Sequence, residues 1–266
     1  MSLSREQMLV EMGISPIWIL RDGEQSIAEP VATAPAHVAE VIPEAAPIPA
    51  IQPVSPVIAT PIAVPQGHFL QGAVDALDWP KLAQAVSACR ACPLCQQRKQ
   101  AVLGVGDLNP DWLFIGEGPG ADEDAQGEPF VGQAGKLLDN MLAALDISRG
   151  NKVYIGNAVK CRPPGNRTPE AMELTTCRPY LERQIALLKP KIIVLLGKVA
   201  VHSLLLDDKS LASLRGKRFE YGGIPVVVTY HPAYLLRNLP DKAKAWEDLL
   251  FARRVLNEVV APELPF

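Results

Sequence analysis

Short apolar runs and longer amphipathic segments alternate along the chain from residue 72 onwards. The apolar runs have the length and unbroken hydrophobicity of strands that are buried on both faces of a parallel sheet. In the segments between them, apolar residues recur every three or four positions, which predicts helices with one buried face. The expected strands are 112–117, 152–159, 190–197 and 224–232, and the expected helices are 78–89, 134–147, 168–188, 198–206 and 241–259.

This alternation predicts an α/β fold, a three-layer α/β/α sandwich around a mainly parallel central sheet. Asp78 and Thr168 are the expected N-caps of two helices, because a proline follows each of them in the first turn. Sheets of this kind bind ligands where the carboxyl ends of the strands meet. The functional site is therefore expected in the loops 116–133, 157–168 and 230–238.

The first 71 residues do not share this pattern. Residues 1–29 combine a short helical stretch with the apolar segment "SPIWIL". Nine prolines lie between residues 30 and 65, and proline disrupts helices and sheets alike. Residues 30–71 are therefore predicted to be a disordered linker with polyproline character. Two interpretations of the N-terminal peptide stay open: it docks on a protein partner, or it folds back onto the domain of residues 72–266.

Charge is distributed unevenly along the chain. The formal net charge is −3, yet residues 149–218 contain 14 basic and five acidic residues. Such a surplus attracts polyanions such as nucleic acids, and it is also typical of a solvated basic surface. We find no apolar run of about 18 residues that would span a membrane. Arg5, Glu6 and Glu11 stand where a secretory signal has its apolar core, so we expect a cytoplasmic monomer without membrane contact.

The five cysteines indicate a metal centre. Cys89 and Cys92 have a spacing that lets two thiolates bind one metal group, and Cys161 and Cys177 form a second pair on either side of a loop. Four thiolates suit zinc or an iron–sulfur cluster, while the alternative is a set of buried free thiols. Cys92 and Cys95 have the same spacing, so they stay open as a competing ligand pair.

The segment "GEGPGADEDAQGEPFVGQAGKLL" (116–138) poses a question of ligand chemistry. Its first glycines are typical of a loop that binds phosphate through backbone N–H groups. However, the segment contains five acidic residues and no basic residue before Lys136. A loop with this negative charge repels an anion, so the charge argues against phosphate and leaves the identity of the ligand open.

Together these segments resemble the iron–sulfur, family-4 uracil-DNA glycosylases. The similarity rests on "CRACPL" (89–94), "VLGVGD" (102–107), the acidic glycine loop (116–138), "NAVKCRPPGNRTP" (157–169) and "HPAYLLRN" (231–238), which occur in the family's order. The resemblance implies an enzyme that flips uracil out of single- or double-stranded DNA and hydrolyses its N-glycosidic bond. The product is an abasic site for base excision repair. It also implies a 4Fe–4S cluster on Cys89, Cys92, Cys161 and Cys177, with Cys95 as a bystander.

The resemblance also assigns roles in a uracil pocket. Phe130 corresponds to the residue that stacks on the flipped base, and Asn157 can recognise its Watson–Crick edge because an amide both donates and accepts. Gly118, beside Glu117, lets the backbone approach the ring. His231 matches the histidine that stabilises the departing uracil through O2.

A carboxylate is expected near the sugar, where it favours the cationic transition state and orients water. By resemblance we expect this carboxylate to be Glu123, with Glu117 and Asp124 as alternatives. Contacts to DNA are expected from two regions of the chain. The predicted DNA-binding residues are Arg162, Arg167, Leu235, Leu236 and Arg237, with the two leucines as the wedge that fills the vacated stack.

Other functions are compatible with parts of this pattern. One is a uracil-DNA-binding protein of the same fold that uses a histidine in an insertion, but the segment "CRPPGNRTPE" contains neither histidine nor insertion. Another is a non-catalytic, polymerase-associated iron–sulfur module, and a third is a nucleic-acid-binding domain stabilised by zinc. The polymerase-associated role is compatible with glycosylase activity, and it becomes a true rival only if Asn157 and His231 are dispensable.

Overall fold

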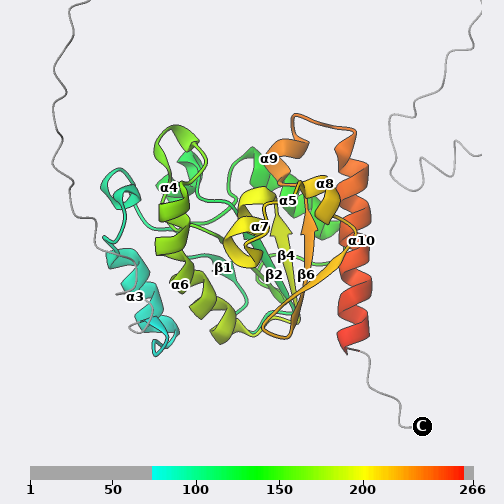
Figure 1. Ribbon diagram of the computed structural model, residues 1–266, viewed down its shortest axis with the longest axis horizontal. Coiled ribbons are helices and arrows are strands. Elements are labelled where there is room, and N and C mark those ends of the chain that lie inside the picture. Colours follow the sequence, from blue (N-terminus) through cyan, green and yellow to red (C-terminus); the bar gives the residue numbers. More distant parts are fainter. Residues whose placement is uncertain (1–73, 261–266) are drawn as a thin grey trace, which may run out of the picture. The chain divides into compact units, whose positions relative to one another are not determined.

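The structure, a computed structural model, describes residues 74–260 (Figure 1). The predicted N-terminal peptide (1–29) and linker (30–71) lie outside the described residues. The described part forms one six-stranded sheet with helices on both faces, so the predicted α/β/α sandwich is confirmed. No helix in this part of the chain is both long enough and apolar enough to cross a membrane.

The sheet has a parallel centre and two antiparallel edges. Its strand order is β1-β3-β2-β4-β6-β5. The central strands β3, β2, β4 and β6 run parallel, while the short edge strands β1 and β5 pair antiparallel with their neighbours. The strand bounds are β1 Val105–Gly106, β2 Trp112–Gly116, β3 Val153–Asn157, β4 Ile192–Leu196, β5 Arg218–Tyr221 and β6 Ile224–Thr229.

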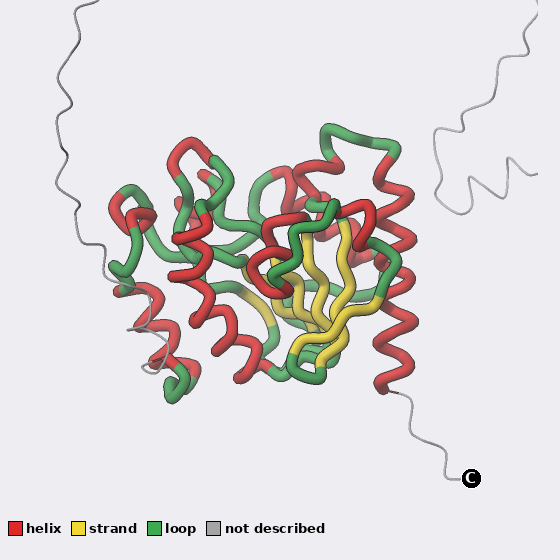
Figure 2. The backbone as a smooth tube through the Cα atoms, in the orientation of Figure 1, coloured by secondary structure: helices red, strands yellow, loops and turns green. Residues whose placement is uncertain are grey.

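Helices cover both faces of this sheet (Figure 2). The residues of α5 and α10 pack on one face, and those of α6, α7 and α8 pack on the other. The helix bounds are α3 Trp79–Ala88, α4 Ala121–Gln126, α5 Gln133–Ala143, α6 Ala171–Leu188, α7 Lys198–Leu205, α8 Leu211–Leu214, α9 Pro232–Leu235 and α10 Asp241–Val260, with 3-10 turns at Pro93–Gln96 and Pro164–Asn166.

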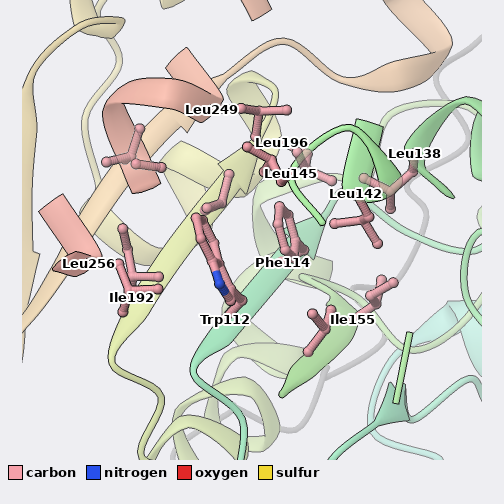
Figure 3. Packing of buried hydrophobic residues seen from close by; sticks show 14 of the residues in the cluster. Trp112, Phe114, Leu138, Leu142, Leu145, Ile155, Ile192, Leu196, Leu249 and Leu256 are labelled. Atoms are coloured by element: carbon pink, nitrogen blue, oxygen red, sulfur yellow. The ribbon is translucent and has the colours of Figure 1, made fainter. Parts of the chain in front are cut away.

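Strand β2 shows how the two cores are separated. Trp112 and Phe114 point to the α5 and α10 side, where they pack against residues such as Leu142 (Figure 3). Leu113 and Ile115 belong to the opposite core, with α6 and α7. Because every residue of β2 is buried, the unbroken apolar run is explained by burial on both faces. The packed strands fix the positions of the loops that follow them.

The helix starts were predicted with mixed success. Asp78 caps α3 as predicted, since its side chain accepts a hydrogen bond from the backbone N–H of Lys81. The prediction that Thr168 caps the long helix is wrong. Helix α6 begins at Ala171 with Glu170 as N-cap, because Glu173 accepts the Glu170 backbone N–H and closes a capping box.

Candidate active site

The three predicted loops meet in one cleft at the carboxyl ends of the central strands. The cleft has a volume of about 600 Å³. It is lined by residues that follow β2, β3 and β6, in agreement with the rule for parallel sheets. The predicted site residues among its lining are Glu117, Gly118, Glu123, Phe130, Asn157, Arg167, His231 and Arg237.

Asn157, the last residue of β3, lies in the wall of the cleft. Its side chain is 2% exposed, and Oδ1 has no hydrogen-bond partner among residues 74–260. A buried acceptor without a partner is unfavourable, so its presence at a cleft indicates a ligand that donates to it. Gly116 makes room for this amide, because a Cβ there would lie 2.5 Å from both Asn157 Oδ1 and the Phe130 ring.

Phe130 is held in an unusual backbone conformation, with φ of 56°. The Arg149 guanidinium donates hydrogen bonds to the carbonyls of Pro129 and Phe130 and forms an ion pair with Asp139. This contact fixes the loop that carries the aromatic ring. The Phe130 ring stacks with the His231 ring at a centroid distance of 5.5 Å, so both rings lie at the same end of the cleft.

The tautomer of His231 follows from its hydrogen bond. Nδ1 accepts the backbone N–H of Ala233 at 3.1 Å, so in the neutral ring Nε2 carries the proton. Burial, together with the positive charge of Arg237, lowers the pKa of His231 to about 4, against a small opposing effect of Glu123. At neutral pH the residue is therefore an uncharged donor through Nε2–H.

The three acidic candidates differ in their contacts. Glu123 accepts backbone N–H groups from Gly120, Val131 and Gly132 at 2.9, 3.0 and 3.2 Å, which closes the loop around α4. Asp124 is buried and accepts from the backbone N–H groups of Lys99 and Gln100.

Glu117 has a different environment. Within the described part of the chain no hydrogen bond affects its carboxylate, and burial raises its pKa. It lines both the cleft and an adjoining cavity of about 660 Å³. Of the three carboxylates, Glu117 is the one that remains available to a ligand, whereas Asp124 supports the loop.

The predicted DNA-binding residues differ in how accessible they are in the structure. Leu236 is 42% exposed and Arg237 lines the cleft, as a DNA-contacting loop requires. The prediction that Leu235 acts as a wedge is wrong, because its side chain is 1% exposed and packs in the cluster with Tyr230 and Ala245.

The two arginines of the loop after β3 both contact protein side chains. Arg162 donates to Asn166 Oδ1 at 2.7 Å. Arg167 lines the cleft, but both of its terminal nitrogens donate to the buried carboxylate of Glu173, at 2.9 and 2.7 Å. Arg167 therefore stabilises the start of α6, and a DNA contact from it stays a prediction.

Four cysteines line one small cavity between α3, the loop after β3 and α6. They are Cys89, Cys92, Cys161 and Cys177, whereas Cys95 is absent from the lining. Burial raises the pKa of Cys92 to about 11 and that of Cys177 to about 12. Such buried thiols become thiolates only beside strong positive charge, which a bound metal supplies.

The cavity also provides hydrogen bonds to sulfur. Arg98 donates to Cys161 Sγ at 2.7 Å, and the backbone N–H of Lys160 donates to Cys177 Sγ at 3.3 Å. Among residues 74–260, no three Cys, His, Asp or Glu side chains converge on a position for a single metal ion. The four thiols around one cavity nevertheless match, in number and kind, the ligands that an iron–sulfur cluster requires.

Three residues around the site carry no sequence signal that singles them out: Arg98, Arg149 and Lys160. Arginine and lysine are most often solvated, and Arg98 and Arg149 bind groups far away in the sequence. The one hint is that Lys160 lies between the apolar segment 153–159 and Cys161.

Comparison with known proteins agrees with the geometry. Residues 103–250 match the family model of the uracil DNA glycosylase superfamily, which is more than half of the chain. The chain belongs to this superfamily, and the resemblance stated from its motifs is confirmed.

Within the superfamily, the chain is similar to type-4 enzymes. It is 46% identical over 166 residues to the type-4 uracil-DNA glycosylase of Thermotoga maritima, covering 61% of this chain and 85% of that protein. It is 41% identical over 181 residues to the type-4 enzyme of Pyrobaculum aerophilum, covering 65% and 92%. Identity to the type-5 uracil-DNA glycosylase of Thermus thermophilus is 30% over 161 residues, covering 48% and 73%.

Proposed function

We propose that the protein is a uracil-DNA glycosylase of type 4, which hydrolyses the N-glycosidic bond of uracil in DNA and leaves an abasic site. The observation that carries this proposal is the buried Oδ1 of Asn157, which has no partner within residues 74–260 and lies in the cleft with Phe130 and His231. Uracil is a neutral ligand that donates from N3–H beside an acceptor, O4. This complements the two ends of an amide.

Recognition begins with extrusion of the nucleotide, because the glycosidic bond cannot be reached inside the duplex. The flipped ring stacks on Phe130, whose loop Arg149 holds in place. Asn157 accepts from N3–H and donates to O4. Cytosine presents an acceptor at N3 and a donor at N4, so the same amide discriminates against the normal base.

Cleavage develops negative charge on the departing uracil and positive charge on the sugar. The Nε2–H of His231 donates to uracil O2 as this charge grows, and a neutral imidazole with a fixed tautomer is already oriented for that role. A carboxylate of the acidic loop stabilises the sugar cation and orients the attacking water. The free carboxylate of Glu117 supports this assignment to Glu117 more than to Glu123.

We further propose that Cys89, Cys92, Cys161 and Cys177 hold a 4Fe–4S cluster. Their shared cavity and the N–H donors to two of the sulfurs support this ligand set. When bound, the cluster supplies a cross-link that ties α3 and α6 to the loop after β3. Iron and sulfide analysis with absorbance at about 400 nm tests the cluster, whereas one zinc per colourless chain would contradict it.

The domain of residues 72–266 is proposed to be the catalytic unit, with DNA contacts from Leu236, Arg237 and Arg162. Exposure of Leu236 and the place of Arg237 in the cleft lining support the first two. The corresponding partner is uracil-containing DNA, in single or double strands.

The test of function is strand cleavage of an end-labelled oligonucleotide that contains one uracil. The oligonucleotide is incubated with wild-type protein, Asn157→Ala or the control Asn151→Ala, and is then heated in alkali. Asn151 is exposed and outside the cleft. We expect cleavage at uracil alone, lost in Asn157→Ala and kept in the control. If the iron-loaded wild type binds DNA tightly but does not cleave at uracil, the proposed enzymatic activity is refuted and a non-catalytic module is favoured.

A further inference from the structure

Lys160 is a buried charge that the proposed chemistry does not use. It follows β3 by three residues and is 1% exposed. No carboxylate of residues 74–260 forms an ion pair with it. A buried ammonium is unfavourable unless a negative partner compensates for the lost hydration.

The surroundings of Lys160 join the two sites described above. Its Nζ donates a hydrogen bond of 2.6 Å to the backbone carbonyl of Asn157, the residue whose amide lies in the cleft. Lys160 also lines the cysteine cavity, and its charge interacts with Cys177 and Cys161. Lys160 therefore hydrogen-bonds the base-recognition residue and also lines the cavity of the proposed metal ligands.

We propose that Lys160 is a positioning residue that couples the cysteine centre to uracil recognition. This rests on the proposed function. Four thiolates carry more negative charge than an iron–sulfide core carries positive charge, so the ligated centre is an anion that stabilises the buried ammonium. The ammonium in turn binds the carbonyl side of the Asn157–Ala158 peptide, whose N–H side already donates to the Gly116 carbonyl at 2.9 Å. The amide plane of Asn157 is thereby kept in the orientation that uracil requires.

Arg98 provides a matched control. It is a second cation at the same cavity, and it donates to Cys161 Sγ and to the carbonyls of Ser87 and Cys89. It makes no hydrogen bond to a residue of the cleft within the described part of the chain, and it is absent from the cleft lining. Removing either cation changes the electrostatics of the metal centre, but only removal of Lys160 frees the Asn157 carbonyl.

The experiment compares wild type, Lys160→Met and Arg98→Gln, each purified anaerobically with its iron content measured. The reduction potential of the centre is measured by voltammetry, and the affinities for free uracil and for an abasic-site oligonucleotide are measured by calorimetry. Both variants are expected to shift the potential to more negative values, because each removes a positive charge. Lys160→Met alone is expected to weaken uracil binding by about tenfold, the usual effect of losing one charged hydrogen bond. Binding of abasic DNA is expected to stay at the wild-type level.

Wild-type uracil affinity in iron-loaded Lys160→Met would overturn the proposal, whether or not the reduction potential shifts. If this variant does not retain iron, Lys160→Gln carries the same test. Loss of iron from both Lys160→Met and Lys160→Gln, while Arg98→Gln keeps its full iron content, would also overturn the proposal. Lys160 would then serve to retain the metal centre rather than to position Asn157. A wild type that neither binds nor excises uracil would instead refute the proposed function.

Discussion

At the residue scale, the cleft combines atoms that already have protein partners with atoms that do not. The Glu123 and Asp124 carboxylates each accept at least two backbone N–H groups, whereas Glu117 and Asn157 Oδ1 accept none within the described residues. A group with satisfied hydrogen bonds shapes the loop, and a group without them is available to substrate. This difference separates carboxylates that the sequence presents as equivalent.

The two glutamates are therefore expected to respond differently to substitution. Glu117→Gln should lower the single-turnover excision rate by about 100-fold, the range of acid–base catalysis, with DNA affinity unchanged. Since burial raises the pKa of Glu117, its charged form is lost on acidification at a higher pH than for an ordinary carboxylate. The acidic limb of the rate profile should disappear in the variant. Glu123→Gln should mainly lower the melting temperature, because it loosens three backbone contacts. If instead Glu123→Gln lowers the excision rate and Glu117→Gln lowers only the melting temperature, Glu123 is the carboxylate that orients the attacking water.

His231 is expected to act without a change of charge. Its pKa near 4 keeps the imidazole neutral down to about pH 5, so excision should show no inflection at about pH 6.5, where an ordinary histidine titrates. His231→Gln should lower the rate by about 100-fold or more, as for loss of an oxyanion donor. The control His202→Gln, on α7 and paired with Asp208, should have the wild-type rate. Titration of the His231 ring between pH 6 and 7, followed by NMR, would contradict the neutral-donor role.

At the element scale, the conformation of the loop before α5 is fixed by hydrogen bonds from Arg149, which lies outside that loop. Arg149→Met removes the hydrogen bonds to the Pro129 and Phe130 carbonyls and the ion pair with Asp139. Phe130 then loses the support for its positive φ, and uracil affinity should fall by about tenfold with little change in abasic-DNA binding. Arg253→Met, at an exposed position of α10, is the control. Equal uracil inhibition constants for both variants would refute this role.

The elements also show what the sequence could predict. The four central strands could be predicted because their residues are mostly apolar and all of them except the half-buried Ile224 are buried. The edge strands are not, since β1 has two residues and β5 alternates exposed and half-buried positions. Helix α4 lies within the acidic glycine loop, and it forms because Glu123 accepts the Gly120 N–H. The segment "HPAYLLRN" correctly predicted a position at the cleft. It did not predict that Leu235 is buried and Leu236 exposed, because the two leucines are adjacent and the sequence does not show which one faces the core.

At the scale of the whole molecule, a chain with net charge −3 has to approach a polyanion. Of the basic residues between positions 149 and 218, Arg167 lines the cleft and Lys198, at the start of α7, lines the adjoining cavity. In the proposed complex with DNA, the carboxyl ends of the strands face the phosphates and the acidic loop after β2 faces the extruded nucleotide. DNA affinity should therefore decrease with salt although the overall charge is negative.

The exposed Leu236 is predicted to enter the duplex as the base leaves it. Leu236→Ala should lower excision from double-stranded DNA by about tenfold, because the vacated stack is no longer filled and unstacking costs a few kcal/mol. Excision from single-stranded DNA should not change, because no stack has to be opened. Leu206→Ala, at an exposed leucine after α7, controls for loss of surface apolar area. Equal losses on single and double strands would mean that Leu236 contacts the substrate without opening the helix, and the opening would then depend on the pocket alone.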